Sequence, residues 1–252
     1  MVSTRNAAAV MSKTPTVTVQ KSCFIVIDDV LPELERDRLW NYFQLQPFQR
    51  VDALGMQGQW PLEDSGVLRG PTVGWEQAWD AQYPTKSPID DVMRALVEAA
   101  PAFADTIGER GRDWTVFNAC ATLTAAGQGR LWHRDGDDDR GSWVYYAHPE
   151  WNIEWGGELF IAPDTELPAE LGVYLHRLRP MDDRPTVPWK SHLDNADASR
   201  VLMERGMGSF VLPKPNRLVV VKGSAPRSLA KVRLSAGRHV HATLGGVFKQ
   251  RR

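Results

Sequence analysis

Apolar residues repeat with two different periods along the chain. In the N-terminal part, Leu39 and Phe43 lie four positions apart, and the same spacing recurs between residues 87 and 100. Residues four apart share one face of a helix, whereas residues two apart share one face of a strand. The sequence therefore predicts one helix from about Pro32 to Pro47 and a second helix over 87–100.

Short, β-branched and aromatic segments bounded by Gly, Asp and Pro make up most of the remaining pattern. Segments of this kind are typical of strands. Two leading helices followed by about seven short strands favour a mainly β sandwich or barrel with supporting N-terminal helices. The predicted strands are 22–28, 114–123, 130–135, 142–147, 157–162, 217–222, 229–234 and 238–244.

Three segments lack a clear period. Residues 1–20 are predicted to be a flexible arm, which leaves 21–252 as a single domain. Residues 51–85 are rich in Gly, Pro and Trp and are predicted to be irregular and to face the substrate. Residues 164–215 form a long insertion, and because loops of that length are usually functional or disordered, we predict a lid over the barrel mouth.

Composition excludes several classes of partner. Apolar residues make up 42% of the 252-residue chain, enough for a sizeable core, and the net charge is −1, so no strong field attracts nucleic acid or an anionic membrane. No apolar run approaches the roughly 20 residues that cross a bilayer. Cys23 and Cys120 lie in apolar runs, and no secretory signal is visible, so we expect buried thiols and a cytoplasmic protein.

The sharpest chemical signal is a His-x-Asp tripeptide at His133 and Asp135. On a strand these two side chains point to the same face, where they would supply two of the three ligands of a facial iron triad. The tripeptide alone is common by chance. A surface histidine beside the acidic loop 137–139 is the alternative interpretation.

The surroundings of this tripeptide resemble the prolyl-4-hydroxylase-like branch of the Fe(II)/2-oxoglutarate dioxygenases. In that family a His-x-Asp strand precedes an aromatic strand and a Trp-x-x-Gly-Gly-Glu-Leu segment. The chain also resembles the family in its opening, its next strand and its closing strand. The matching segments are 133–163, 25–32, 216–221 and 236–248.

The resemblance implies a double-stranded β-helix of the jelly-roll or cupin-like type. It also implies an enzyme that uses Fe(II), O₂ and 2-oxoglutarate as cosubstrate. The expected reaction is hydroxylation, desaturation or ring formation on a small substrate, derived from an amino acid or a natural product.

One departure from the family concerns Arg227 and His241. The family places its distal iron-binding His where this chain has Arg227, and an Arg or Lys that grips 2-oxoglutarate where this chain has His241. Arginine carries only donors and is always charged, so it is no plausible iron ligand but is well suited to a carboxylate.

Three interpretations follow from this departure. In the first, His241 is the third iron ligand and Arg227 holds the cosubstrate. In the second, only His133 and Asp135 bind iron, and Arg238 is the carboxylate clamp. In the third, the protein is a catalytically degenerate member of the fold with a binding or regulatory role.

Two further residues are candidates for cosubstrate binding. Asn118 and Thr122 share one face of the predicted strand 114–123, where they would hydrogen-bond 2-oxoglutarate or simply fill the barrel interior. His148, in a His-Pro-Glu-Trp turn, is interpreted as structural.

Overall fold

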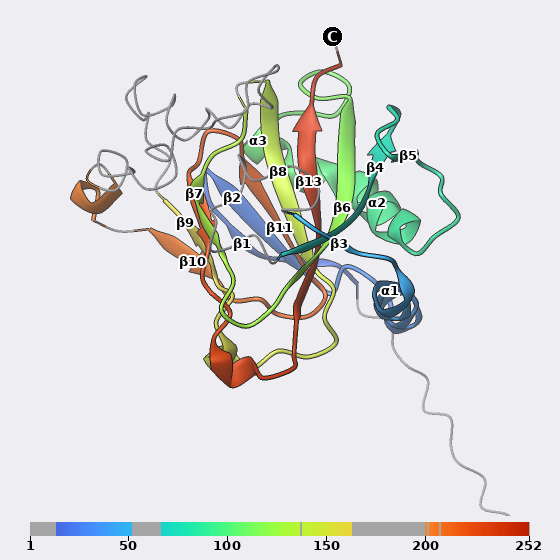
Figure 1. Ribbon diagram of the computed structural model, residues 1–252. Helices are drawn as coiled ribbons and strands as arrows, with labels where there is room; N and C mark the ends of the chain where they lie inside the picture. Colours follow the sequence, from blue (N-terminus) through green and yellow to red (C-terminus); the bar gives the residue numbers. More distant parts are fainter. Residues whose placement is uncertain are drawn as a thin grey trace, which may run out of the picture.

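The computed structural model describes residues 14–51, 67–136, 138–162, 200, 202–206 and 208–251. Within these ranges the chain folds into two β-sheets with helices on the outer side of the larger one (Figure 1). The prediction of a mainly β, double-stranded β-helix architecture with supporting N-terminal helices is confirmed, although the sheets do not close into a barrel.

The larger sheet has the strand order β1-β2-β11-β8-β13-β6-β4-β3, with β5 paired to β4. All neighbours are antiparallel except β4 and β5. Its strands are β1 (Thr16–Gln20), β2 (Phe24–Asp28), β3 (Gln49–Arg50), β4 (Leu68–Trp75), β5 (Ala81–Gln82), β6 (Val116–Thr124), β8 (Asp139–Tyr146), β11 (Arg217–Lys222) and β13 (His241–Lys249).

The smaller sheet is antiparallel and has the order β10-β9-β12-β7. Its strands are β7 (Arg130–His133), β9 (Leu159–Ile161), β10 (Ser209–Val211) and β12 (Arg227–Leu229). Because β6 is followed by β7, the chain passes from the larger sheet to the smaller one immediately before the His-x-Asp tripeptide.

The helices are α1 (Glu33–Leu45), α2 (Ile89–Glu98) and the short α3 (Ala104–Ile107), so both long helices lie where the sequence predicts them. Their buried residues Leu39 and Met93 belong to one apolar cluster with Leu218 of β11. The alternate residue Val219 packs instead with Ile161 of the smaller sheet. Strand β11 is therefore buried on both faces, against helices on one side and the smaller sheet on the other.

Three sequence predictions are corrected by the fold. Strand β1 falls inside the predicted flexible arm, and because its five residues are all exposed, no buried apolar face marked it. Strand β4 falls inside the segment predicted to be irregular, because Gly70 and Pro71 interrupt its alternation, and its register with β6 shifts between Arg69 and Thr72. Strand β12 occupies 227–229 rather than 229–234.

Most of the predicted lid, 164–215, lies outside the described residues. Of the part that is described, Ser209–Val211 form β10, an edge strand of the smaller sheet. None of the helices in the described ranges has the length and apolar character that a bilayer crossing needs.

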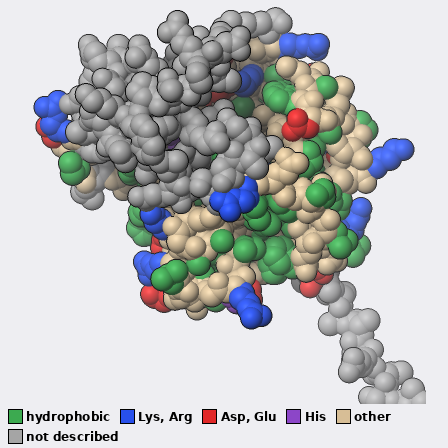
Figure 2. All heavy atoms as spheres, in the orientation of Figure 1, with side chains coloured by type: hydrophobic (Ala, Val, Ile, Leu, Met, Phe, Trp, Pro, Cys, Tyr) green, Lys and Arg blue, Asp and Glu red, His purple; other side chains and the backbone are tan. Residues whose placement is uncertain are grey.

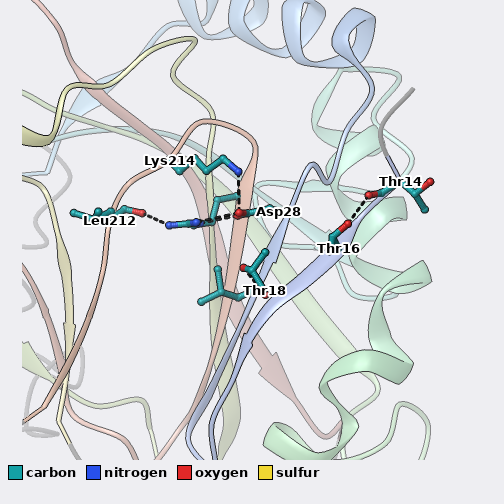
Figure 3. A network of polar contacts seen from close by, with 8 residues as sticks. Thr14, Thr16, Thr18, Asp28, Leu212 and Lys214 are labelled. Atoms are coloured by element: carbon teal, nitrogen blue, oxygen red, sulfur yellow. Dashed lines mark hydrogen bonds and ion pairs between the residues drawn. The ribbon is translucent and has the colours of Figure 1, made fainter. Parts of the chain in front are cut away.

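An ion-pair cluster around the buried Asp28 joins β2 to β11 (Figure 3). Arg217 donates from Nε and Nη2 to the two carboxylate oxygens at 2.7 and 3.0 Å, and Lys214 Nζ lies 2.8 Å from Oδ2. Burial alone raises the pKa of Asp28, but hydrogen bonds from Arg217 and Lys214 outweigh it and leave the pKa lowered. Arg217 also donates to the Leu212 carbonyl at 2.9 Å, which anchors the connection from β10 to β11.

Candidate functional site

A cavity of about 270 Å³ lies between the two sheets. Both sheets contribute polar and apolar side chains to it. The lining residues are Arg69, Asn118, Cys120, Thr122, Thr124, Arg130, His133, Asp135, Ser142, Trp143, Val144, Tyr146, Leu159, Val221, Arg227, Leu229, His241, Thr243, Gly245, Gly246 and Val247.

One end of the cavity holds His133, Asp135 and Arg227. His133 ends β7 and is the direct cross-strand partner of Arg227 in β12. Asp135 follows two residues later, and its backbone N–H donates to the Gly223 carbonyl at 3.1 Å. Arg227 Nη2 donates to Asp135 Oδ1 in an ion pair whose two side chains are only 7% and 5% exposed. Arg227 therefore neutralises the carboxylate that was predicted to bind iron.

Three protein ligands for iron are not assembled in the described residues. No group of three His, Cys, Asp or Glu side chains there could hold a metal ion. The position beside His133 and Asp135 is filled by a guanidinium group, which has no lone pair to offer and repels a cation. The described residues around His133 and Asp135 therefore do not fit a facial triad.

His241 lies in a different part of the cavity. It begins β13 opposite Thr124, is 1% exposed, and its ring centroid is 5.3 Å from that of His148. Trp151 and Tyr146 complete the group, with ring centroids 5.1 and 5.5 Å from His241. The structure thus groups His241 with a second histidine and two aromatic rings rather than with the Asp135–Arg227 pair.

Both histidines of this group are neutral near pH 7. Burial lowers the pKa of His148 to about 4, and burial together with the neighbouring His148 holds the pKa of His241 well below 6.5. His148 Nε2 lies 2.9 Å from the Pro213 carbonyl, which can only accept, so a neutral His148 carries its proton on Nε2. Its Nδ1 is then a hydrogen-bond acceptor.

Several polar atoms of this group have no hydrogen-bond partner among the described residues. They are the Tyr146 hydroxyl, His148 Nδ1 and both ring nitrogens of His241. Looser backbone contacts from Ala242 to His148 and from Gly157 to His241 raise the pKa values of the two imidazoles without forming a regular hydrogen bond. Burial raises the pKa of Tyr146, so its hydroxyl keeps its proton. Because buried polar groups are almost always hydrogen-bonded, this concentration of unsatisfied atoms marks a place where a ligand or water is expected.

The remaining predicted site residues differ in whether they line the cavity. Arg238 is exposed in the turn before β13 and does not belong to the described cavity lining, which does not fit a clamp. Asn118 lines the cavity, but its Oδ1 accepts the Val247 N–H at 2.9 Å, so it also ties β6 to β13. Thr122 lines the cavity between Arg69 and Thr243, its cross-strand partners.

Sequence reasoning missed two arginines in the cavity lining, Arg69 and Arg130. Arg130 and His133 are three residues apart and would face opposite sides of a regular strand. The pairing of β7 with β12 is irregular. Arg130 pairs with Leu229 and His133 pairs with Arg227, so a step of three residues along β7 matches a step of two along β12. This irregularity brings both side chains to the cavity, and no residue type marks it in the sequence.

No protein-family model matches the chain, and no curated protein matches it significantly. Solved structures do match. A prolyl-4-hydroxylase from Pseudomonas putida aligns with a TM-score of 0.51 at 17% identity, over 92% of this chain and 95% of that one. A prolyl hydroxylase from Trichoplax adhaerens, in complex with a hypoxia-inducible-factor peptide, aligns with a TM-score of 0.53 at 13% identity, over 91% and 84%.

A third match is a non-heme alpha-ketoglutarate-dependent carbocyclase from nogalamycin biosynthesis, with a TM-score of 0.51 at 13% identity, over 94% and 87% of the two chains. At these identities the likeness concerns the fold. The chain therefore has the fold of the Fe(II)/2-oxoglutarate oxygenases, with prolyl hydroxylases among its structural neighbours, as the sequence resemblance predicts.

Proposed function

We propose that this chain is a small-molecule-binding protein built on the oxygenase fold, with a cavity that takes a small organic carboxylate and, in the described part of the chain, no three-ligand iron centre. The observation that carries the proposal is the buried ion pair between Arg227 and Asp135. To bind Asp135, Fe(II) would have to displace the guanidinium group of Arg227. A small organic acid can bind without breaking this ion pair.

The charge of the cavity supports an anionic ligand. Among its described lining residues, Arg227 pairs with Asp135, and Arg69 and Arg130, which also interact with other residues, add two further guanidinium groups. Charge-assisted hydrogen bonds from arginine to carboxylate contribute on the order of 1.5–3 kcal/mol each. The cavity volume of about 270 Å³ suits a small acid rather than a peptide.

The test is iron binding by the wild type and by Arg227→His, measured as bound Fe(II) per chain after anaerobic loading and desalting. We expect no stoichiometric iron in the wild type and a clear gain in Arg227→His, because the variant replaces a cation by a neutral ligand beside His133 and Asp135. Arg238→His, which changes an exposed arginine, is the matched control and should gain no iron at this site.

The second candidate is an Fe(II)- and 2-oxoglutarate-dependent oxygenase acting on a small amino-acid-derived or natural-product substrate. Its support is that His133 and Asp135 both line the cavity, and that the fold is shared with oxygenases. If the wild type binds one Fe(II) per chain, loses it in His133→Ala and Asp135→Ala, and forms succinate from 2-oxoglutarate under O₂, this candidate replaces the first.

A further inference from the structure

We propose that the end of the cavity formed by Tyr146 and His241 is a subsite for an uncharged hydrogen-bonding group. The ligand is then a short monocarboxylate whose far end carries an amide or hydroxyl rather than a second carboxylate. This inference rests on the proposed function, because it presumes that the cavity binds an organic acid.

Two buried polar side chains form the subsite. Tyr146 and His241 each have 1% of their surface exposed, and both line the cavity. The Tyr146 hydroxyl and both His241 ring nitrogens have no well-formed hydrogen bond among the described residues, although the Gly157 backbone lies close enough to raise the pKa of His241. Two side chains that line one cavity thus carry unsatisfied polar atoms, and the neutral His148 contacts both of their rings.

The rings are held in place by their neighbours. A Cβ on Gly157 would come within 2.9 Å of His241 Cδ2, so the absence of a side chain there lets the imidazole lie against the backbone. Trp151 stands at 77° to the His241 ring and is fixed by its own Nε1–H bond to the Gly156 carbonyl at 2.9 Å. The polar atoms are therefore oriented before a ligand arrives, which reduces the entropy lost on binding.

The chemistry of these groups favours a neutral partner. A tyrosine hydroxyl donates and accepts, and a neutral imidazole has one donor and one acceptor nitrogen, which together match an amide. The charged groups that act on Tyr146 are Arg217 and Glu158, and they oppose each other. A second carboxylate would thus be buried with no cation in contact with it among these groups, a state that costs far more than burying a hydrogen-bonded amide.

Arg227 and His241 meet different parts of the segment that leads into β9. Arg227 pairs with Ile161 at the end of β9, whereas His241 packs on Gly157, two residues before β9 begins. A short linear acid can therefore contact Arg227 with one end and the Tyr146–His241 subsite with the other.

The experiment compares three acids of equal chain length by calorimetric titration of the full chain: glutarate, glutarate monoamide and pentanoate. We expect the monoamide to bind at least about tenfold more tightly than either of the others, the shift that corresponds to about 1.4 kcal/mol. In Tyr146→Phe, which removes only the hydroxyl, the affinity for the monoamide should fall towards that for pentanoate.

His241→Arg should reverse the preference in favour of glutarate, and His239→Arg, at a half-exposed ring stacked on Trp155, is the matched control that should not. If glutarate or pentanoate binds the wild type as tightly as the monoamide, the subsite is refuted while the proposed function stands. If none of the three acids binds, the proposed function fails and the inference falls with it.

Discussion

At the scale of single residues, Arg227 decides what the cavity can do. Histidine at this position would offer a lone pair beside His133 and Asp135, whereas arginine offers donors and a permanent charge. The ion pair with Asp135 is buried, and removing one partner of such a pair typically costs about 3–5 kcal/mol because the other charge is left uncompensated. With arginine at this position, the corner beside His133 holds a buried ion pair rather than a third metal ligand.

His148 provides a residue-scale prediction about pH. Its pKa is lowered from 6.5 to about 4, so between these values the unfolded chain binds a proton that the folded protein does not. The free energy of unfolding should therefore fall as the pH falls through this window, by about 3 kcal/mol at its lower end, and His241 should act in the same direction.

Urea unfolding of His148→Gln at several pH values checks this prediction. The glutamine has no proton to gain, so the pH dependence between about pH 4 and pH 6.5 should weaken relative to wild type. His239→Gln, at a half-exposed ring, is the control that should retain the wild-type slope. An unchanged slope in His148→Gln would mean that other groups cause the acid sensitivity.

At the scale of elements, Gly246 sets how closely β13 approaches β6. A Cβ at Gly246 would overlap the carbonyl oxygen and Oδ1 of Asn118, whereas a Cβ at Gly70 in β4 would meet nothing closer than 3.5 Å. Gly246→Ala should therefore lower the free energy of unfolding by about 3 kcal/mol, and Gly70→Ala by less than about 1 kcal/mol. The urea midpoints of the two variants test this, and equal midpoints would contradict it.

The elements that the sequence predicted share a clear local signal. Helix α2 has its apolar stripe, and β11 is a run of apolar residues because both of its faces are buried. Strand β1 has only exposed side chains, and β4 buries Val73 and Gly74 only after its Gly70-Pro71 interruption, so neither shows the regular alternation of burial that makes a strand recognisable.

The residues of the candidate site also differ in how far the sequence predicts them. The His-x-Asp pair was predictable because both residues lie close together in the sequence. The partner of Asp135 lies 92 positions away, and the ring neighbours of His241 all lie in the distant segment 146–151. Such contacts depend on strand register, which periodicity does not determine across distant segments.

At the scale of the whole molecule, recognition depends on the cavity rather than on the outer surface. In the described part of the face in Figure 2, acidic and basic side chains are scattered without a large patch of one sign. With a net charge of −1, long-range attraction contributes little to the capture of an anion. Affinity must then come from short-range contacts inside the cavity.

Because the cavity is shared by both sheets, a bound acid should stabilise them as one unit. Arg227 belongs to the smaller sheet, whereas Tyr146 and His241 belong to the larger one, so a ligand that contacts all three acts across the interface. At a ligand concentration of about 100 times Kd, the free energy of global unfolding should rise by about 2.7 kcal/mol.

Native-state hydrogen exchange measures whether this stabilisation reaches both sheets. With glutarate monoamide bound, amides of β11 in the larger sheet and of β12 in the smaller sheet should slow by the same free energy, since both open only in global unfolding. Amides of β1, an exposed edge strand, should respond less because they exchange by local fraying. Slowing confined to β7 and β12 would mean that the smaller sheet opens independently and that the ligand binds to it alone.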